Sequence, residues 1–434
     1  MRRLAPASIP ILGWIVVLLY AYPGIVTWDG VQLLAEARSG IYADDHPPVY
    51  IAIWHVVDLV VPGPAGMLVL QTGLFLVGLI ALFRRWMTPL GASIAATVVF
   101  VFPPVMVPMA AVWKDSLMAG LLVVGAAAVL AERPRWRIVG ALALCVATAV
   151  RYNAAAATFA LIAVVDWVPG WSGVRRYATA AGVWIAITAA ALVANSALTD
   201  KHMYAWQSLV APSDIVGIIA HVDEPLSDSE LLRLLDGTEL RVTHDIQAAA
   251  HALYSPRDGQ RAIAQGDRAF WQVPFYDPLP PARRDAFTRA WWQLVREHPL
   301  AYAEHRVATM GAVLERSNGA VSWRGHPNDA WLRAELGLQT DWPRAQLGAT
   351  HALQRFERAI PVFTPWLYLV LALVVAPLAL RSRDLGALLA SGIMYECSLL
   401  VLATSPDYRY SHWMVVATTV CIVALVVRRM RSAS

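Results

Sequence analysis

The sequence predicts an all-α polytopic membrane protein. The chain of 434 residues is 58% hydrophobic and only 15% charged, whereas soluble domains average about 45–50% apolar and about 25% charged residues. Long apolar runs recur along the chain, and arginine clusters separate many of them. The 18 tryptophans are typical of a protein with two membrane interfaces, where indole rings anchor at the level of the lipid headgroups.

Ten apolar runs approach the roughly 20 residues that a membrane-spanning helix needs. They cover residues 8–24, 64–83, 90–107, 114–131, 137–151, 153–168, 178–198, 361–380, 386–403 and 411–427. The first run follows Met1-Arg2-Arg3 and is interpreted as an uncleaved signal anchor. A shorter run at 49–61 contains His55 and Asp58, which predicts a helix lying on the outer membrane surface. We expect about ten spanning helices with interfacial helices beside them.

Basic residues cluster on one side of these predicted spans. The clusters lie at 2–3, 84–85, 133–137, 175–176, 381–383 and 428–431. Because positively charged loops stay in the cytoplasm, both termini are predicted to be cytoplasmic. Abundant alanine, arginine and tryptophan with few lysines indicate a bacterial, GC-rich genome, and the expected location is the bacterial inner membrane. The net charge of +4 follows from this orientation and gives no indication of nucleic-acid binding.

The polar residues divide the chain into three parts. Residues 1–198 form a predicted N-terminal transmembrane module, which includes a first outer loop at 23–64, and residues 361–434 form the last spanning helices. The segment 199–360 holds 20 of the 31 acids and eight of the 11 histidines, so it is predicted to be an extracytoplasmic, mainly helical domain. Its apolar stripes at helical spacing include 229–235 and 287–300.

The polar motifs between the spans fall on the predicted outer side. Asp29 follows the first span within Thr27-Trp28-Asp29-Gly30. It has two interpretations, which are compatible: an N-cap that forms a capping box with Gln32, or a general base at the membrane surface. Further on, Asp44-Asp45-His46-Pro47-Pro48 is either a helix entry, since proline favours the first helical position, or a polar cluster at the membrane surface.

These two motifs carry a resemblance to a known family. An aspartate after the first span, followed by Asp-x-His-Pro-Pro and an interfacial helix, resembles the protein O-mannosyltransferases and the lipid A aminoarabinose transferases. Both groups belong to the GT-C superfamily of glycosyltransferases, which use polyprenyl-phosphate sugars as donors. The resemblance implies a GT-C-like bundle, Asp29 as catalytic base, and His46 and its neighbours as shapers of the site. The chain departs from the family by having Gly30 where a second acid is common, so that role would pass to Asp44 or Asp45.

Two further motifs open or interrupt predicted spans. Lys114 and Asp115 begin the fourth span, and an acid here is similar to the second acidic motif of GT-C enzymes. Asp115 is alternatively a helix cap, and Lys114 a side chain that reaches to the interface. Arg151 and Asn153 interrupt the apolar stretch 138–165, where an arginine is costly unless it is paired or functional.

The last motif lies in a short outer loop before the final span. Tyr408-Arg409-Tyr410 resembles the Arg-Tyr motif near the last helices of GT-C enzymes, where a guanidinium is suited to bind a lipid phosphate in bidentate fashion. Its alternative role is an ion pair with Asp407. Glu396 lies within the ninth predicted span, where a buried acid indicates either function or a structural hydrogen bond.

Together these residues predict a transferase that moves a sugar from a polyprenyl phosphate to the hydroxyl of a glycan, lipid or protein by one inverting displacement. Asp29 is the expected base, with Asp45, His46 and Asp115 beside it, and the expected substrate-binding residues are Lys114, Arg151, Asn153, Glu396, Tyr408, Arg409 and Tyr410. The sequence establishes no cofactor: Asp44, Asp45, His46 and Asp115 are of types that bind a divalent ion, but their spacing does not compel one. The three cysteines, Cys145, Cys397 and Cys421, lie in apolar runs and have no metal-ligand spacing. The alternatives are a ligase or polymerase that uses a diphosphate-linked donor, a lipid or solute transporter, and a non-enzymatic scaffold.

Overall fold

The structure, a computed structural model, describes residues 5–264, 269–273, 277–315, 319–321 and 330–433. Throughout these ranges the regular elements are helices, accompanied by two isolated β-bridges. The prediction of an all-α protein is therefore confirmed for the described part of the chain.

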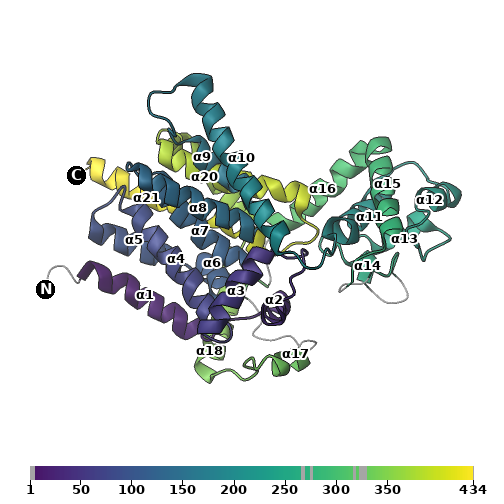
Figure 1. The fold of residues 1–434 in the computed structure, drawn as a ribbon, viewed down its shortest axis with the longest axis horizontal. Coiled ribbons are helices and arrows are strands. Elements are labelled where there is room, and N and C mark those ends of the chain that lie inside the picture. The colour runs from purple at the N-terminus through teal and green to yellow at the C-terminus, as the bar shows by residue number, and fades with distance from the viewer. Residues whose placement is uncertain (1–4, 265–268, 274–276, 316–318, 322–329, 434) are drawn as a thin grey trace.

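The helices of the first 198 residues form one side of an apolar bundle (Figure 1). They are α1 (Ala5–Ala21), α2 (Trp28–Ser39), α3 (Pro48–Val60), α4 (Ala65–Phe83), α5 (Pro89–Val101), α6 (Pro103–Ala110), α7 (Lys114–Val129), α8 (Pro134–Val150), α9 (Ala154–Ala163) and α10 (Gly173–Leu198). Proline at the first helical position opens α3, α5, α6 and α8, because its fixed φ suits that position and its missing N–H would be unpaired there.

The rest of the chain builds a head and then returns to the bundle (Figure 1). The head helices are η1 (Trp206–Val210), α11 (Ala211–His221), α12 (Asp228–Leu234), α13 (Ile246–Leu253), α14 (Arg261–Ala264), α15 (Pro281–Glu297) and α16 (Pro299–Leu314). The returning helices are α17 (Ala330–Glu335), α18 (Arg344–Ala359), α19 (Pro365–Ala379), α20 (Arg383–Leu402), η4 (Tyr408–Ser411) and α21 (His412–Ala433).

Among the described residues, four helices are long and apolar enough to cross a membrane: α4, α10, α20 and the span Tyr408–Met430. The pair α5 and α6 adds a fifth if it counts as one span, although it bends by 69° at Phe102. Each of the other predicted runs also contains a helix, but α1, α7, α8, α9 and α19 have only 10 to 17 residues. A polytopic membrane protein is confirmed, and the number of about ten spans remains a prediction.

Close backbone packing holds α4, α7 and α8 together. A Cβ on Gly78 of α4 would lie 2.8 Å from the Val124 nitrogen, and one on Gly140 of α8 would lie 2.5 Å from the Val129 nitrogen. Glycine is required at both contacts because any side chain would push the helices apart. Small residues at helix contacts are typical of packing inside a membrane, where backbones approach closely without a hydrophobic driving force.

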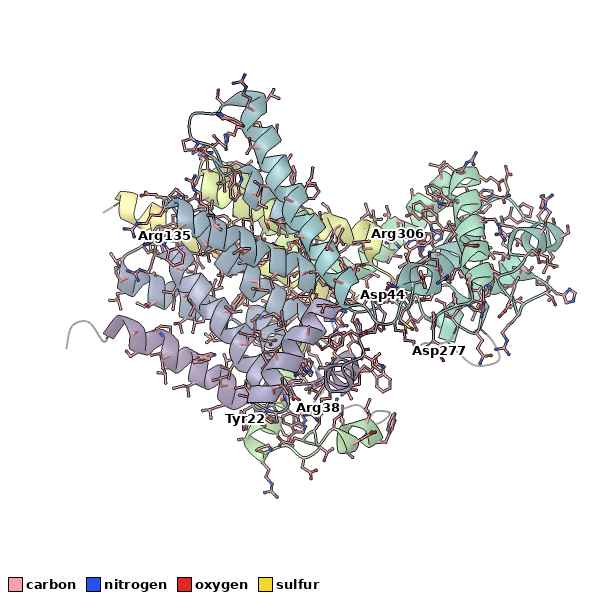
Figure 2. All side chains as sticks on the ribbon, viewed as in Figure 1. Tyr22, Arg38, Asp44, Arg135, Asp277 and Arg306 are labelled. Carbon is pink, nitrogen blue, oxygen red and sulfur yellow. The ribbon has the colours of Figure 1, made fainter. Side chains whose placement is uncertain are left out.

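Both termini lie at one end of the bundle, and the head lies at the other (Figure 1). The arginine clusters gather at the end of the termini. Arg85 pairs with Asp384 at 2.8 Å, Arg383 pairs with Asp166 at 3.3 Å, and Arg428 lies over the Trp86 ring. Figure 2 shows Arg135 at this end and Arg306 at the head. The predicted segregation of arginines is thus present in three dimensions, except for Arg2–Arg3, which lies outside the described residues.

The segment 199–360 contributes to three hydrophobic clusters, the smallest of which packs Val313 of α16 against Leu399 and Ala403. Residues between Leu209 and Tyr302 form the core of the head, around Trp271 and Phe287. In contrast, α17 and α18 pack on the bundle, where Arg333 donates to the Val26 carbonyl at 2.6 Å and Gln346 donates to the Leu19 carbonyl at 3.0 Å. The helices α17 and α18 therefore hold in place, through these hydrogen bonds, the chain between the end of α1 and the start of α2.

Candidate functional site

A short parallel backbone contact sets the geometry at the head end of the bundle. Ile25 and Ala111 form an isolated β-bridge, and the Val112 nitrogen donates to the Ile25 carbonyl at 2.9 Å. This contact places the start of α2 beside the start of α7. The Trp113 indole then donates to Thr27 Oγ1 at 2.7 Å, which fixes the two helix entries against each other.

Gly30 lies where these entries meet. A Cβ here would lie 2.9 Å from Val26 Cγ1 and 3.4 Å from the Val112 carbonyl oxygen. Such contacts require the neighbours to shift, so this position does not accept a larger side chain without strain. The packing gives a physical reason why the chain has glycine where related motifs often have a second acid.

Asp29 is the second residue of α2, and the N-cap position is occupied by Thr27. The predicted N-cap role of Asp29, with its capping box to Gln32, is therefore wrong. The same correction applies to Asp115, because Trp113 is the N-cap residue of α7. Both carboxylates are instead engaged by arginines from distant parts of the chain.

Arg409 connects Asp29 to the last motif. Its Nη2 donates to Asp29 Oδ2 at 2.7 Å, and its Nε lies 2.8 Å from Asp407 Oδ2. The guanidinium also lies over the Trp113 ring, 4.9 Å from the ring centroid. The Asp29 side chain keeps 29% of its surface exposed, whereas Arg409 keeps 11%, so the carboxylate is the accessible member of the pair. The predicted Arg409–Asp407 pair exists as well.

The electrostatic surroundings keep Asp29 ionised. Burial raises the pKa of the Asp29 carboxyl, but the nearby positive charges, chiefly Arg409 and also Lys114, outweigh it and hold the pKa below the usual range. A carboxylate with a lowered pKa is a weak base. Asp29 can therefore accept a proton readily only when Arg409 moves away from it.

Lys114 and His46 form a second pair beside Asp29. Lys114 Nζ lies 2.7 Å from His46 Nδ1. Burial, and then the Lys114 charge, lower the pKa of His46 to about 3. The imidazole is consequently neutral at ordinary pH, and its Nδ1 lone pair accepts from the ammonium group. Lys114 is thereby positioned without having its charge neutralised by this partner.

Arg151 provides a third cation at the break between α8 and α9. Its Nε lies 3.1 Å from Asp115 Oδ1, a carboxylate with no exposed surface, and its guanidinium lies 5.1 Å from the Tyr410 ring centroid. Tyr410 therefore lies next to both Arg151 and Arg409, whose distance to the same ring is 5.5 Å. Asn153 is the N-cap residue of α9, two positions beyond Arg151.

Other predicted site residues have different surroundings. Asp44 accepts from the Met203 nitrogen at 2.6 Å and bonds His202, so it joins the first loop to the start of the head. Asp45 is exposed at the surface. Within the described residues no group of three or more His, Cys, Asp or Glu side chains is arranged to hold a metal ion.

Tyr408 and Glu396 hold the η4 turn. The Tyr408 hydroxyl donates to the Pro104 carbonyl at 3.2 Å, and Ser411 donates to Glu396 Oε1 at 2.8 Å. These bonds attach the turn to α6 and α20. The geometry favours a positioning role for both side chains, and their predicted contact with substrate remains a prediction.

One acid at the site was not identified from the sequence. Glu36 accepts from the Ala43 nitrogen at 3.2 Å, and burial, opposed by that bond and assisted by the Asp45 charge, raises the pKa of Glu36 to about 7. Glu36 lies seven residues after Asp29, so both are on the same face of α2. The spacing of seven residues between Asp29 and Glu36 was the feature of the sequence that could have identified Glu36.

Comparison with known proteins adds little to this geometry. No protein-family model matches the chain, and no curated protein sequence matches it. A search of solved structures found similarity to the crystal structure of ArnT from Cupriavidus metallidurans bound to undecaprenyl phosphate, with 15% sequence identity and a TM-score of 0.33, covering 99% of this chain and 78% of that one. Similarity at this level supports no inference about activity.

Proposed function

We propose that the chain is a membrane glycosyltransferase that moves a sugar from a polyprenyl-phosphate donor to an acceptor hydroxyl. The observation that supports this most strongly is the contact between Asp29 and Arg409 at 2.7 Å, with Lys114 and Arg151 in the same cluster. It combines one accessible carboxylate with three cations, at the end of an apolar bundle that can hold a lipid tail.

The charges in this cluster fit a lipid phosphate. Arg409 and Arg151 each have a carboxylate partner, whereas Lys114 bonds a neutral imidazole. A phosphate that approaches Lys114 would also attract Arg409 away from Asp29, while Asp407 continues to hold the arginine. Arginine is suited to this exchange because its fork of donors binds two groups at once.

The exchange of Arg409 between Asp29 and the donor phosphate would make donor binding precede activation of the acceptor. Asp29 is a weak base while Arg409 is bonded to it, because that charge contributes to its lowered pKa. Once the donor phosphate takes Arg409, the Asp29 carboxylate becomes a stronger base for the acceptor hydroxyl. The acceptor is then activated only when a donor is bound, which limits side reactions with water.

The chemical step is a single displacement. The acceptor oxygen bonds to the anomeric carbon, the bond between that carbon and the phosphate oxygen breaks, and the acceptor proton passes to Asp29. The electron pair leaves with the polyprenyl phosphate, whose charge Arg409 and Lys114 stabilise. Electrostatic stabilisation of this kind usually contributes more to the rate of an enzyme than any other single effect. The leaving group is a stable anion, so no second carboxylate acid of the glycosidase type is needed, and the configuration inverts.

The test is native mass spectrometry of the purified protein, with Arg409→Ala compared against Arg257→Ala. Arg257 is an exposed arginine that pairs with Glu315 in the head, so it serves as a matched control. We expect a bound polyprenyl monophosphate, with or without one sugar, in the wild type and the control but not in Arg409→Ala. A diphosphate-linked oligosaccharide would support the ligase alternative. The absence of any isoprenoid would contradict the proposal and favour a transporter or scaffold.

A further inference from the structure

A charged pocket lies at the opposite end of the bundle from Asp29. Its volume is about 510 Å³, and its lining combines arginines with the loop between α9 and α10. The lining includes Arg137, Asp166, Trp171, Ser172, Arg176 and Arg383. Nothing in the proposed transfer reaction uses this pocket.

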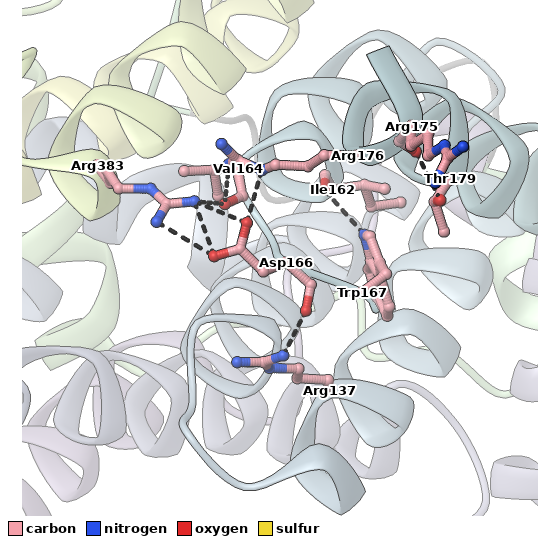
Figure 3. Close-up of polar contacts among 9 residues, drawn as sticks. All are labelled: Arg137, Ile162, Val164, Asp166, Trp167, Arg175, Arg176, Thr179 and Arg383. Carbon is pink, nitrogen blue, oxygen red and sulfur yellow. Dashed lines mark hydrogen bonds and ion pairs between the residues drawn. The ribbon is translucent and has the colours of Figure 1, made fainter. Parts of the chain in front are cut away.

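Three helices bring the arginines together (Figure 3). Arg137 comes from the first turn of α8, Arg176 from the first turn of α10, and Arg383 is the first residue of α20. The far end of α8 leads to the proposed active site, since α8 ends at Val150, next to Arg151. About 14 residues of α8 separate the two arginines, or roughly 20 Å. The pocket is therefore a separate site.

The charge of the lining is unbalanced. Asp166 pairs with Arg176 at 2.6 Å and with Arg383 at 3.3 Å, while Arg137 donates to the Asp166 backbone carbonyl at 2.6 Å. Arg176 and Arg383 also donate to the Val164 carbonyl. These described lining residues comprise three guanidinium groups and one carboxylate, so the pocket has a net charge of +2.

Two helix starts add to this potential. α10 and α20 begin at the pocket, and their N-cap residues, Ser172 and Ser382, have no side-chain capping bond. The unpaired N–H groups and the helix dipoles favour an anion there. The arginines supply the specific recognition, because a guanidinium fork binds phosphate oxygens in pairs.

The surroundings of the pocket fit a lipid better than a free ion. α10 is a 26-residue apolar helix, and only 11% of its apolar window is buried. Its exposed side chains include Ile185, Leu192 and Val193. Acyl chains can lie along this surface while a headgroup enters the pocket at its beginning. Trp171, which lines the pocket and is 46% exposed, suits the headgroup level of a bilayer.

We infer that this arginine pocket binds the phosphate headgroup of an anionic phospholipid. The lipid would belong to the membrane leaflet on the side of the bundle where both chain termini lie. The lipid would hold the starts of α8, α10 and α20 together, where three like charges converge. Basic pockets between helix ends are suited to such headgroups, with each basic side chain contributing roughly a fivefold gain in affinity.

The test is lipid titration by native mass spectrometry with phosphatidylglycerol and, as the uncharged reference, phosphatidylcholine. Arg383→Lys should bind phosphatidylglycerol severalfold more weakly, because it keeps the charge but loses the fork. Asp166→Asn should bind it about fivefold more tightly, because it removes the carboxylate. Arg175→Ala is the matched control, since Arg175 is exposed and is absent from the pocket lining.

Each outcome decides the inference. If Asp166→Asn only lowers thermal stability and leaves phosphatidylglycerol affinity unchanged, the arginines serve their protein partners and the inference fails. It also fails if both lipids bind equally, or if Arg175→Ala has the same effect as Arg383→Lys. Binding of inorganic phosphate as tightly as phosphatidylglycerol would reassign the pocket to a free anion. Thermal unfolding of every variant separates lost binding from lost folding.

Discussion

Arg409 donates to the carboxylate of Asp29 at 2.7 Å, although 380 residues separate them in the chain. The bond joins the beginning of α2 to the η4 turn, and it lies beside Lys114 and the Trp113 ring. The Arg409 charge helps to keep the Asp29 carboxylate ionised and weakly basic, and in the proposed mechanism this contact links donor binding to acceptor activation.

The first prediction concerns the proposed base. Asp29→Asn keeps the size of the side chain but removes its ability to accept a proton, so the transfer rate should fall about 10²–10⁴-fold. The measurement is sugar transfer from a polyprenyl-phosphate donor by the purified protein. Thermal unfolding of the same sample shows whether the protein stays folded. Full activity in a folded Asp29→Asn protein would exclude Asp29 as the base.

The same substitution should affect donor binding in the opposite direction. Without the Asp29 charge, Arg409 no longer has to leave a carboxylate to reach a phosphate, so polyprenyl phosphate should bind about three- to fivefold more tightly. Asp58→Asn is the matched control, because Asp58 pairs with Arg38 elsewhere in the first loop. Equal or weaker binding by Asp29→Asn would contradict the exchange of Arg409 between the two anions.

A third prediction follows from the raised pKa of Glu36. Its folded-state pKa of about 7 lies above the ordinary glutamate value of 4.5, so the contribution of Glu36 to stability is complete below pH 4.5 and is lost as the pH rises through 7. Relative to Glu36→Gln, the wild type should therefore lose about 1–2 kcal/mol between pH 5 and pH 8, after allowance for partial exposure. Thermal unfolding at both pH values checks this, and parallel pH profiles would contradict it.

A fourth prediction concerns the buried pair of Asp115 and Arg151. Asp115→Asn leaves the Arg151 guanidinium without its carboxylate and should destabilise the protein by about 3–5 kcal/mol. Replacing both partners, as Asp115→Asn with Arg151→Met, should cost less than the sum of the single changes, because no unpaired charge remains. Unfolding of all three variants measures the coupling, and additive effects would mean that the pair does not interact.

The fifth prediction tests the packing at Gly30. Gly30→Ala would bring a Cβ to 2.9 Å from Val26 Cγ1, and overpacking of this kind typically costs about 1–3 kcal/mol. Val26→Ala should partly restore stability to Gly30→Ala, although alone it should destabilise. The melting temperatures of the two single variants and the double variant provide the comparison. If the second substitution gives no recovery, the contact with Val26 does not limit this position.

Much of the bundle could be predicted from local features of the sequence. Runs of apolar residues give helices because a membrane leaves no water to satisfy backbone groups, and the arginines at 84–85, 175–176 and 381–383 indicated the shared end where they lie. The break at Arg151 and the turn at Arg409 were visible for the same reason, since a charge in an apolar context is costly without a partner.

Partner choice was decided by the tertiary structure. Nothing local distinguishes Asp29 as the partner of Arg409 from Asp44, which bonds His202 instead. The packing of α17 and α18 on the bundle likewise depends on Arg333 reaching the Val26 carbonyl from 307 residues away. Helix formation and membrane burial depend on neighbouring residues, so the periodicity and composition of the sequence predict them. Ion pairs between distant segments, and the pKa values that follow from them, depend on distances that only the folded chain sets.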